Sequence, residues 1–308
     1  MKFNEYLKSC RQNYNLTQEE LVQELYNLDE NFIGVDTGTL SRWERATTKP
    51  NIDRQISIIK FFQTKSNSVL PCFEKYDYNE IQSQICKTGI QNIIGKNKDL
   101  VLNFPSSYIM ADNLKVTHLR HSDSIDNIIQ IALLLDKEFT NNYSQILDKN
   151  FKSWAMHPSS LFLVCEFKKQ FFGLLFSLRL KPHIFDKIIN FEMQENELDS
   201  SHFATMEEDG CNYILNFFAH SQKAATILYL RYYAHLIANQ NNISRVGVQT
   251  MMEEGKKLIK NIHISYYKDA KFNKHQISSY QSPLSDILIN PDVLKMIFQK
   301  QDCPEDSK

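Results

Sequence analysis

No two cysteines in this 308-residue sequence lie within four residues of each other. A zinc site built on paired cysteines is therefore not expected. No segment approaches a run of about 18 apolar residues, and the N-terminal segment has no apolar core, so we expect neither a membrane span nor a secretory signal. These absences predict a cytoplasmic protein without a membrane partner, with reduced and buried thiols. The cysteines are Cys10, Cys72, Cys86, Cys165, Cys211 and Cys303.

A strong net charge is also missing, since the formal net charge is -1. A protein that coats nucleic acid with positive charge is therefore excluded, although a local basic face is not. Hydrophobic residues make up 42% of the chain, which is enough for a sizeable core, and no internal repeat is found. The length fits two domains. We expect them at residues 1–68 and 111–280, with a helical linker at 69–110 and a C-terminal segment and tail at 281–308.

Residues 1–65 are expected to form four short helices. Thr17 is a good N-cap for the second helix, and Glu20 completes a capping box with it. Asp36 is expected to cap the third helix. Apolar residues recur at helical spacing in the segments FNEYLKSCRQNY, NLTQEELVQELYNL, DTGTLSRWER and DRQISIIKFFQTK.

The stretch TGTLSRWERATTKP, residues 37–50, has two dissimilar sides. Leu40 and Trp43 form an apolar docking stripe, whereas small residues lie toward the other side. In a helix-turn-helix, a helix of this kind enters the major groove of DNA. Arg42 is long enough to donate two hydrogen bonds to a guanine. Gln18, at the start of the preceding helix, can contact a phosphate.

A glutamate close to a phosphate backbone needs a cationic partner. We expect Glu44 to pair with Arg11 of the first helix and so to lock the DNA-reading helix in place. Ordinary surface cations are the alternative interpretation for Arg45 and Lys49. The predicted DNA-binding residues are Gln18, Thr37, Gly38, Thr39, Ser41, Arg42, Arg45 and Lys49.

The pattern LTQEELVQEL followed by GVDTGTLSRWERATTKP resembles the Cro-like phage-repressor family, also called the xenobiotic-response-element (XRE) family. The resemblance covers residues 3–65 and implies an all-α, lambda-repressor-like domain that binds an operator in double-stranded DNA. It also implies a buried ion pair at Arg11 and Glu44. The family's DNA-contacting positions correspond to Gln18, Thr37, Gly38, Ser41 and Arg42. The sequence departs from the family in the extra segment NLDENFI before the third helix, and in Ala46, where glycine is common.

The residues after Leu114 predict an α/β sheet domain, because strand-like and helix-like segments alternate. The fold class is therefore multi-domain, with an all-α N-terminal domain and an α/β (α+β) C-terminal domain. Strands are expected in LKVTHLR, in SLFLVCEFKKQFFGLLFSLRLK as a hairpin, in CNYILNFFA and in ISRVGVQT. Helices are expected in SIDNIIQIALLLDKEF, YSQILDKNFKSWAM, KAATILYLRYYAHLIANQ and EEGKKLIKNI. Between the domains we expect a helix in YNEIQSQICKTGIQNIIGK and an extended connector in NFPSSYIMADN.

This order of elements resembles the general-control-type acetyltransferase (GNAT) superfamily over residues 111–270. The resemblance implies a glycine-rich loop that binds the coenzyme A pyrophosphate at the start of a helix. Here AHSQKAATILYLRYY takes that place, and no glycine lies between Gly210 and Gly247. Methyl groups at Ala224 and Ala225 disfavour a tight anion site. We therefore expect a degenerate domain that is not an enzyme, with no catalytic residue and no required cofactor; acetyl-CoA or another small ligand is left open.

Other candidate sites have ordinary explanations. His118 and His121 lie three residues apart without an evident third metal ligand, so no metal site is expected. The acidic run at 207–209 is typical of a solvated loop, and His220 with Tyr266 is an acid–base pair only if the domain is an enzyme. The aromatic residues expected in the core or at an interface are Phe217, Phe218, Tyr229, Tyr232 and Tyr233.

Together these patterns predict a transcriptional regulator of the bacterial or phage type that binds DNA as a homodimer. Its second domain would dimerise or sense a small-molecule or protein effector. Two alternatives stay open at this point. One is an active N-acetyltransferase that carries a DNA-binding module, and the other is a protein-binding antitoxin or immunity repressor.

Overall fold

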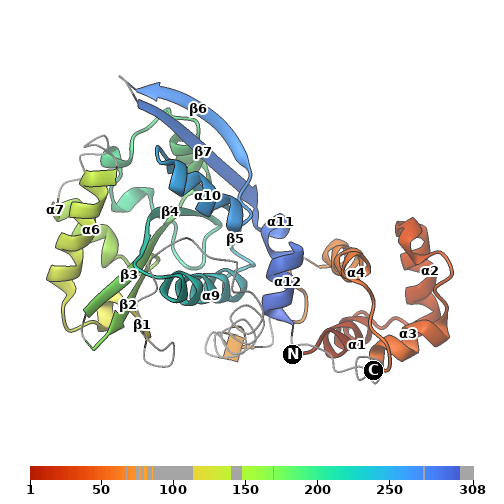
Figure 1. The fold of residues 1–308 in the computed structure, drawn as a ribbon. Helices are drawn as coiled ribbons and strands as arrows, with labels where there is room; N and C mark the ends of the chain where they lie inside the picture. The colour runs from red at the N-terminus through yellow and green to blue at the C-terminus, as the bar shows by residue number, and fades with distance from the viewer. Residues whose placement is uncertain are drawn as a thin grey trace. The chain divides into compact units, whose positions relative to one another are not determined.

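The computed structural model describes residues 1–66, 68–73, 114–139, 148–168, 170–272 and 275–298, together with Tyr76, Asp77, Glu80, Ile81 and Ile85 (Figure 1). Its N-terminal elements are α1 (Phe3–Asn13), α2 (Gln18–Leu28), the 3-10 helix η1 (Glu30–Phe32), α3 (Thr37–Glu44) and α4 (Ile52–Thr64). The expected linker helix and connector lie largely outside the described residues, as does the C-terminal tail from residue 299.

Side-chain caps start α2 and α3 where the sequence predicts. The backbone N–H of Glu20 donates to Thr17 Oγ1 at 3.1 Å, and the N–H of Thr17 donates to the Glu20 carboxylate at 2.7 Å. At α3, the N–H of Thr39 donates to Asp36 Oδ1 at 2.6 Å. These bonds satisfy backbone donors that a helix leaves unpaired in its first turn.

The C-terminal end of α3 explains the departure at Ala46. The N–H of Ala46 donates to the Trp43 carbonyl at 3.1 Å, and that of Thr47 donates to the Arg42 carbonyl at 2.9 Å. This pair of bonds is a Schellman motif. Ala46 has a φ of +60°, in the left-handed region that favours glycine.

The extra segment before α3 packs against α4 through η1. Phe32 is buried, and Ser57 of α4 donates a hydrogen bond to the Asp29 carboxylate at 2.5 Å. On α1, Phe3 and Tyr6 are buried and contact the ring of Phe298, each at a centroid distance of 5.2 Å. Phe298, which follows the C-terminal helix α12 (Pro291–Ile297), therefore packs into the core of the N-terminal helices.

A seven-stranded sheet forms the second region in the described residues, in the order β1-β2-β3-β4-β5-β7-β6. All neighbouring strands are antiparallel except β4 and β5, which are parallel and joined by a helical crossover. The strands are β1 (Lys115–His118), β2 (Leu161–Phe167), β3 (Gln170–Leu180), β4 (Gly210–Ala219), β5 (Ile243–Thr250), β6 (Tyr266–Phe272) and β7 (His275–Pro283).

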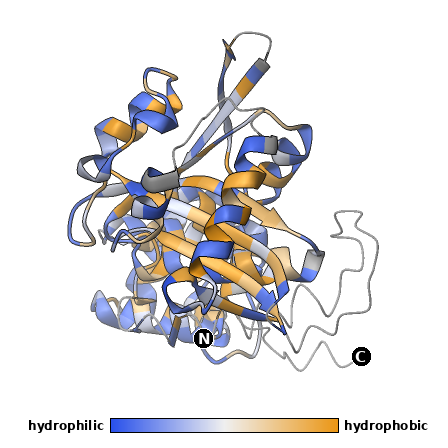
Figure 2. Cartoon of the chain, turned by 90° about the vertical axis from the view of Figure 1, so that its left-hand side faces the viewer, coloured by the Kyte–Doolittle hydropathy of each residue, from blue (hydrophilic) through white to orange (hydrophobic). Residues whose placement is uncertain are grey.

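Helices cover both faces of this sheet, and apolar residues concentrate along its strands (Figure 2). Helices α6, α7 and α8 share one buried cluster with the sheet, to which Trp154 and Phe185 contribute. On the other face, Tyr232 of α9 donates to Asn212 of β4 at 2.6 Å. The helices of this region are α6 (Ile125–Phe139), α7 (Asp148–Ala155), α8 (Pro182–Ile189), α9 (Gln222–Ala238), α10 (Glu253–Asn261) and α11 (Leu284–Leu288), with the 3-10 helices η5 (Leu119–His121), η6 (Glu195–Glu197) and η7 (Ser200–His202).

The predicted fold class, an all-α N-terminal domain with an α/β domain after it, is confirmed, but some elements were missed. Helix α8 was not predicted, although its Pro182 start and its apolar residues at helical spacing are usable signals. Two strands, β6 and β7, follow α10, and residues 284–297 form α11 and α12. At Gly247 of β5, a Cβ atom would lie 2.6 Å from the ring of Phe185, so glycine lets α8 approach the sheet closely.

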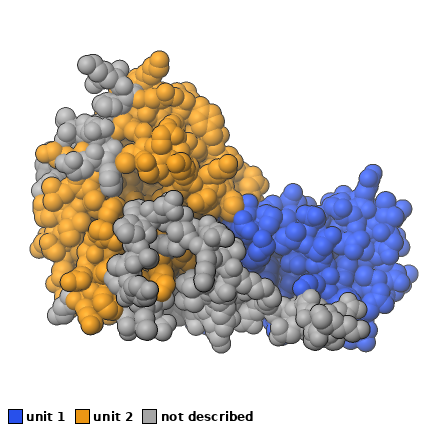
Figure 3. Space-filling model, viewed as in Figure 1, with its two compact units in different colours: residues 1–98, 233–241, 288–308 blue, residues 99–232, 242–287 orange. Residues whose placement is uncertain are grey.

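By compactness the chain divides into two units, coloured separately in Figure 3. The first comprises residues 1–98, 233–241 and 288–308, and the second comprises residues 99–232 and 242–287. Across the described ranges, no helix combines the length and apolar character that a membrane crossing requires.

Candidate nucleic-acid interface and a cavity in the sheet domain

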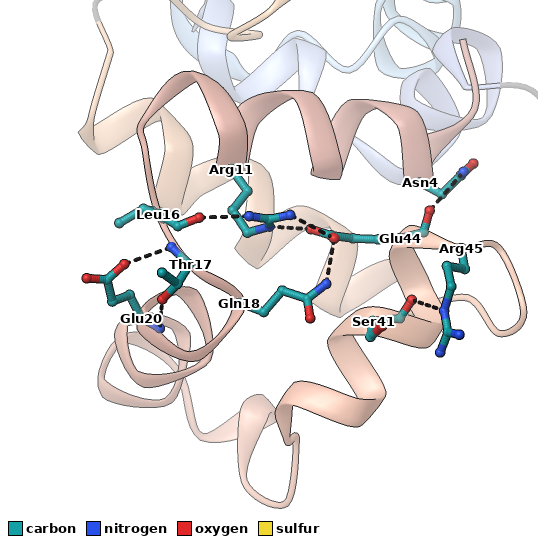
Figure 4. Close-up of polar contacts among 9 residues, drawn as sticks. All are labelled: Asn4, Arg11, Leu16, Thr17, Gln18, Glu20, Ser41, Glu44 and Arg45. Carbon is teal, nitrogen blue, oxygen red and sulfur yellow. Dashed lines mark hydrogen bonds and ion pairs between the residues drawn. The ribbon is translucent and has the colours of Figure 1, made fainter.

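A buried ionic network seats α3 against α1 and α2 (Figure 4). Arg11 Nε lies 2.6 Å from Glu44 Oε1, and Arg11 Nη2 donates to Glu44 Oε2 at 3.0 Å. Gln18 Nε2 also donates to Glu44 Oε2, at 2.8 Å. Only 5% of the Glu44 side chain is exposed, and the hydrogen bond to Glu44 raises the pKa of Arg11. The carboxylate is thus a fixed, charged anchor for α3.

The inner side of α3 is apolar and its outer side is polar. Leu40 and Trp43 are buried, and the guanidinium of Arg54 lies 5.8 Å from the centre of the Trp43 ring. On the outer side, Thr37, Gly38 and Arg42 are exposed, while Thr39 and Ser41 are half-buried. Trp43 therefore packs inward, as an anchor for this helix.

The exposed groups of residues 37–50 carry positive charge. Arg42, Arg45 and Lys49 are exposed, and the acidic residue of this stretch, Glu44, is buried in its ion pair. Arg42 Nη2 donates to Thr39 Oγ1 at 2.8 Å, and Arg45 Nε donates to the Ser41 carbonyl at 3.2 Å. An exposed polar surface with cations on it is suited to a polyanion.

The residues predicted to contact DNA do not all share one environment. Those at 37–42 and Arg45 lie on α3 or at its end, and Lys49 follows in the next turn. Gln18 differs, because its amide is engaged with Glu44. In this structure Gln18 supports the ion pair, and a phosphate contact by Gln18 stays a prediction.

The sheet domain contains a largely apolar cavity of about 410 Å³. The pairing of the parallel strands β4 and β5 ends at Ile214 and Val248, and the cavity lies beside the residues that follow. Apolar side chains of β4, β5, α10 and β7 form most of its wall, and Asn216, Asp136 and Glu195 are polar groups in it. Volume and lining are typical of small-molecule sites.

Three acidic residues line this cavity, and two of them, Asp136 and Glu195, lie close enough for their charges to interact. Asp136 of α6 is 6% exposed, and Glu195 belongs to η6. Burial, with the nearby Asp136 charge as a second cause, raises the pKa of Glu195 to about 8, although a hydrogen bond from the Tyr213 hydroxyl opposes this shift. A carboxyl with such a pKa exchanges protons near neutral pH. The sequence analysis missed these residues, because they are far apart in the chain and belong to no motif.

The start of α9 has alanines where the sequence analysis looked for glycines. Ala224 is fully buried and Ala225 is 5% exposed, so their methyl groups point into the protein core. The N–H of Ala224 donates to Ser221 Oγ at 3.2 Å, which is an ordinary helix cap. Both methyl groups are therefore buried by packing, and the Ala224 N–H is already bonded within the chain.

The remaining candidates occupy separate environments. His118 and His121 lie 6.4 Å apart by ring centroid, and the described residues contain no cluster of three groups that could hold a metal ion. His220 packs against Phe218, whereas Tyr266 packs against Tyr280. The acidic residues at 207–209 are exposed. Among the aromatic residues, Tyr232 and Tyr233 are buried, and Phe217 stacks on Tyr229 at 4.6 Å.

No protein-family model matches this sequence. Over 94 residues, the chain is 32% identical to the HTH-type transcriptional activator BcrR of Enterococcus faecalis. That similarity covers 30% of this chain and 42% of BcrR, so the chain spans less than half the length of this relative.

Solved structures similar to the chain include an N-acyl amino acid synthase and acetyltransferases. FeeM, an N-acyl amino acid synthase from uncultured soil microbes, has a TM-score of 0.40 and 9% identity, over 56% of this chain and 91% of that chain. An acetyltransferase from Streptococcus agalactiae has a TM-score of 0.37 and 9% identity, over 56% and 98%. The acetyl transferase from Salmonella typhimurium that modifies the N-terminal serine of ribosomal protein L7/L12 has a TM-score of 0.34 and 10% identity, over 58% and 98%.

These comparisons contradict the expectation that the chain is not an enzyme. The similar structures are described as an N-acyl amino acid synthase and as acetyltransferases. We therefore withdraw the prediction of an inactive domain.

Proposed function

We propose that the chain is a sequence-specific, DNA-binding transcriptional regulator with an acetyltransferase-like second domain. The N-terminal helices, residues 1–68, bind the operator, residues 69–110 link them to the domain at 111–280, and residues 281–308 follow as the C-terminal segment. The proposal includes membership of residues 3–65 in the XRE family. The similarity to BcrR, an HTH-type transcriptional activator, supports it.

The observation that carries the proposal is the contrast between the two sides of α3. Leu40 and Trp43 are buried on the inner side, and Glu44 is held by Arg11. The outer side offers the exposed Arg42 and small residues that do not obstruct entry into a groove. A helix that is fixed on one side and short-chained and cationic on the other is suited to the major groove.

The proposal also states that the chain binds DNA as a homodimer and that its operator is palindromic. One short recognition helix contacts only a few base pairs, and two half-sites one helical turn apart multiply the affinity. The second domain supports dimerisation or binds a small-molecule or protein effector that changes operator affinity.

Selection of bound oligonucleotides from a random pool tests the DNA-binding proposal. We expect a palindromic consensus, and Arg42→Ala then weakens binding to it by about 10- to 100-fold and relaxes one base position, because a two-donor contact to guanine is lost. Lys8→Ala removes an exposed cation from α1 instead and serves as the matched control. A pool without enriched sequences contradicts the proposal, and unchanged binding by Arg42→Ala removes Arg42 from the reading set.

Acyl transfer is a second candidate function, which the environment of Glu195 favours. An acyl thioester bound in the cavity would supply the activated acyl group. Because the pKa of the Glu195 carboxyl group is about 8, only its ionised fraction can accept a proton from an attacking amine, and this fraction grows as the pH rises toward 8. The apolar wall of the cavity suits a hydrophobic group on the acyl donor or on the amine.

Release of free thiol from acetyl- and longer acyl-CoA thioesters, with a panel of amines, tests this activity in the full chain. We expect Glu195→Gln to reduce the rate by about 100-fold or more, the usual range for loss of a general base. Glu197→Gln, in the same 3-10 helix, should retain the wild-type rate. Thiol release that never exceeds the uncatalysed rate would reject acyl transfer, and equal rates for both variants would reject Glu195 as its base.

A further inference from the structure

Two cysteines that are far apart in the sequence meet in the core of the N-terminal unit. Cys10 lies on α1, and Cys72 lies in the segment 68–73. Their Sγ atoms are 3.0 Å apart, across 62 positions of sequence. Cys10 is fully buried and Cys72 is 6% exposed. A disulfide requires an S–S distance of about 2.05 Å, so a shift of about 1 Å would join them.

The surroundings hold both thiols in this arrangement. The N–H of Leu70 donates to Gln240 Oε1 at 2.5 Å, and Ser68 Oγ donates to Asn241 Oδ1 at 2.7 Å, which attaches the segment just before Cys72. Cys72 has a φ of +71°, a conformation that a non-glycine residue keeps only when its neighbours determine it. The cysteine pair is therefore positioned by several independent contacts.

We propose that Cys10 and Cys72 form a site of reversible oxidation, at which a hydroperoxide converts the two thiols into a disulfide between α1 and the segment 68–73. Cys72, the more accessible thiol, attacks the peroxide; its O–O bond breaks, an alcohol or water leaves, and Cys72 becomes a sulfenic acid. Cys10 then attacks this sulfur, the S–S bond forms, and water leaves with the Cys10 proton. Two thiols are oxidised, and one peroxide is reduced by two electrons.

The other buried cysteines of the described residues lack this chemistry. Cys165 of β2 is as fully buried as Cys10, but among the described residues no second thiol lies beside it. Cys211 of β4 faces Ser244 Oγ at 3.3 Å. The reactivity is therefore assigned to one pair, independently of the proposed DNA-binding function.

The disulfide would stabilise the N-terminal unit, because it closes a long loop in the unfolded chain. Since the thiols already lie close together, the folded state needs little rearrangement. The bond also fixes α1 at the residue before Arg11, which carries the ion pair to α3.

The test treats the full-length protein with hydrogen peroxide, quenches with iodoacetamide under denaturing conditions, and maps peptides by mass spectrometry. We expect loss of two alkylatable thiols, a peptide linked through Cys10 and Cys72, reversal by dithiothreitol, and a Tm higher by several degrees for the N-terminal transition. Cys10→Ser and Cys72→Ser each abolish the linkage and the Tm gain, whereas Cys165→Ser retains both.

Three outcomes would overturn the inference. They are full retention of both thiols at peroxide doses that oxidise exposed methionines, oxidation of Cys72 to sulfinic acid without a linkage, and a disulfide to a different cysteine or a second chain. If a serine variant does not fold, the peptide map and the oxidised-minus-reduced Tm of the wild-type protein decide the question alone.

Discussion

Glu44 of the N-terminal helices is buried and Glu195 of the sheet domain is half-buried, and the two have opposite charged neighbours. Glu44 meets the guanidinium of Arg11 at 2.6 Å and the amide of Gln18 at 2.8 Å. Glu195 instead shares an apolar cavity with a second carboxyl group, that of Asp136. Its pKa is raised to about 8, first by burial and then by that neighbouring charge.

Neighbours therefore decide whether a buried carboxyl group supports the structure or is available for chemistry. A carboxylate that accepts hydrogen bonds from a guanidinium and an amide holds helices together. A carboxyl beside a like charge in an apolar wall keeps its proton near neutral pH and can release it when the environment changes. The helical region uses its glutamate for position, and the sheet domain has one that can exchange a proton.

Removal of the structural glutamate should have the largest effect. Glu44→Ala leaves the Arg11 guanidinium, with 14% of its side chain exposed, without its carboxylate. We expect a loss of about 4 kcal/mol in the local free energy of unfolding, because an uncompensated buried charge remains. Hydrogen exchange of α1 and α3 peptides, read by mass spectrometry, measures it. Glu19→Gln, at an exposed position of α2, is the control; equal protection in both variants would mean that the ion pair contributes little.

The pH dependence of stability should reveal the raised pKa of Glu195. The folded-state pKa of Glu195, about 8, lies above the ordinary 4.5. The stabilisation from its neutral form is therefore complete below pH 4.5 and is lost as the pH rises through 8. We expect the unfolding free energy of the sheet domain to fall by about 3 kcal/mol between about pH 5 and pH 8.

Urea unfolding at a series of pH values measures this slope. Glu195→Gln should remove it, because an amide does not titrate, whereas Glu197→Gln should keep it. If all three proteins show the same slope, the pKa of Glu195 is not the cause.

Asp136→Asn should have an effect of intermediate size, and it tests the contribution of the neighbouring charge to the pKa of Glu195. It removes the like charge but leaves the burial of Glu195, which is the larger cause of the raised pKa. The midpoint of the pH-dependent loss should therefore move to lower pH without reaching the ordinary value. A change of one unit corresponds to about 1.4 kcal/mol. Asp126→Asn, on the same helix, should leave the midpoint in place; a midpoint that rises in Asp136→Asn would contradict the assigned cause.

The smallest effect is expected at the end of α3. Ala46→Gly should raise the stability of the N-terminal helices by about 0.5 to 1 kcal/mol, because glycine adopts the φ of +60° without the steric cost that alanine has. Thr47→Gly, at the next residue, should lower stability instead. Thermal unfolding of the two variants beside the wild type measures both, and a loss of stability in Ala46→Gly would exclude strain at this residue.

The residues that start α2 and α3 and seat α3 were accessible to sequence analysis, because each acts over a short span. The Thr17–Glu20 capping box, the Asp36 cap and the inward Trp43 follow from residues within one or two helical turns. Helix α8 was missed because its eight residues follow β3 after a single residue, Lys181, without a loop that would mark a new element. Asp136 and Glu195 come from separate elements, so no spacing in the sequence could indicate their meeting.

The sequence by itself determined where α2 and α3 begin, which side of α3 is apolar, and that a mixed α/β domain follows. These features depend on hydrogen bonds and side-chain periods that a few neighbouring residues complete. Only the tertiary structure brought Cys10 to Cys72 and Asp136 to the cavity of Glu195. Such meetings depend on how whole helices and strands pack, and packing depends on many distant residues at once.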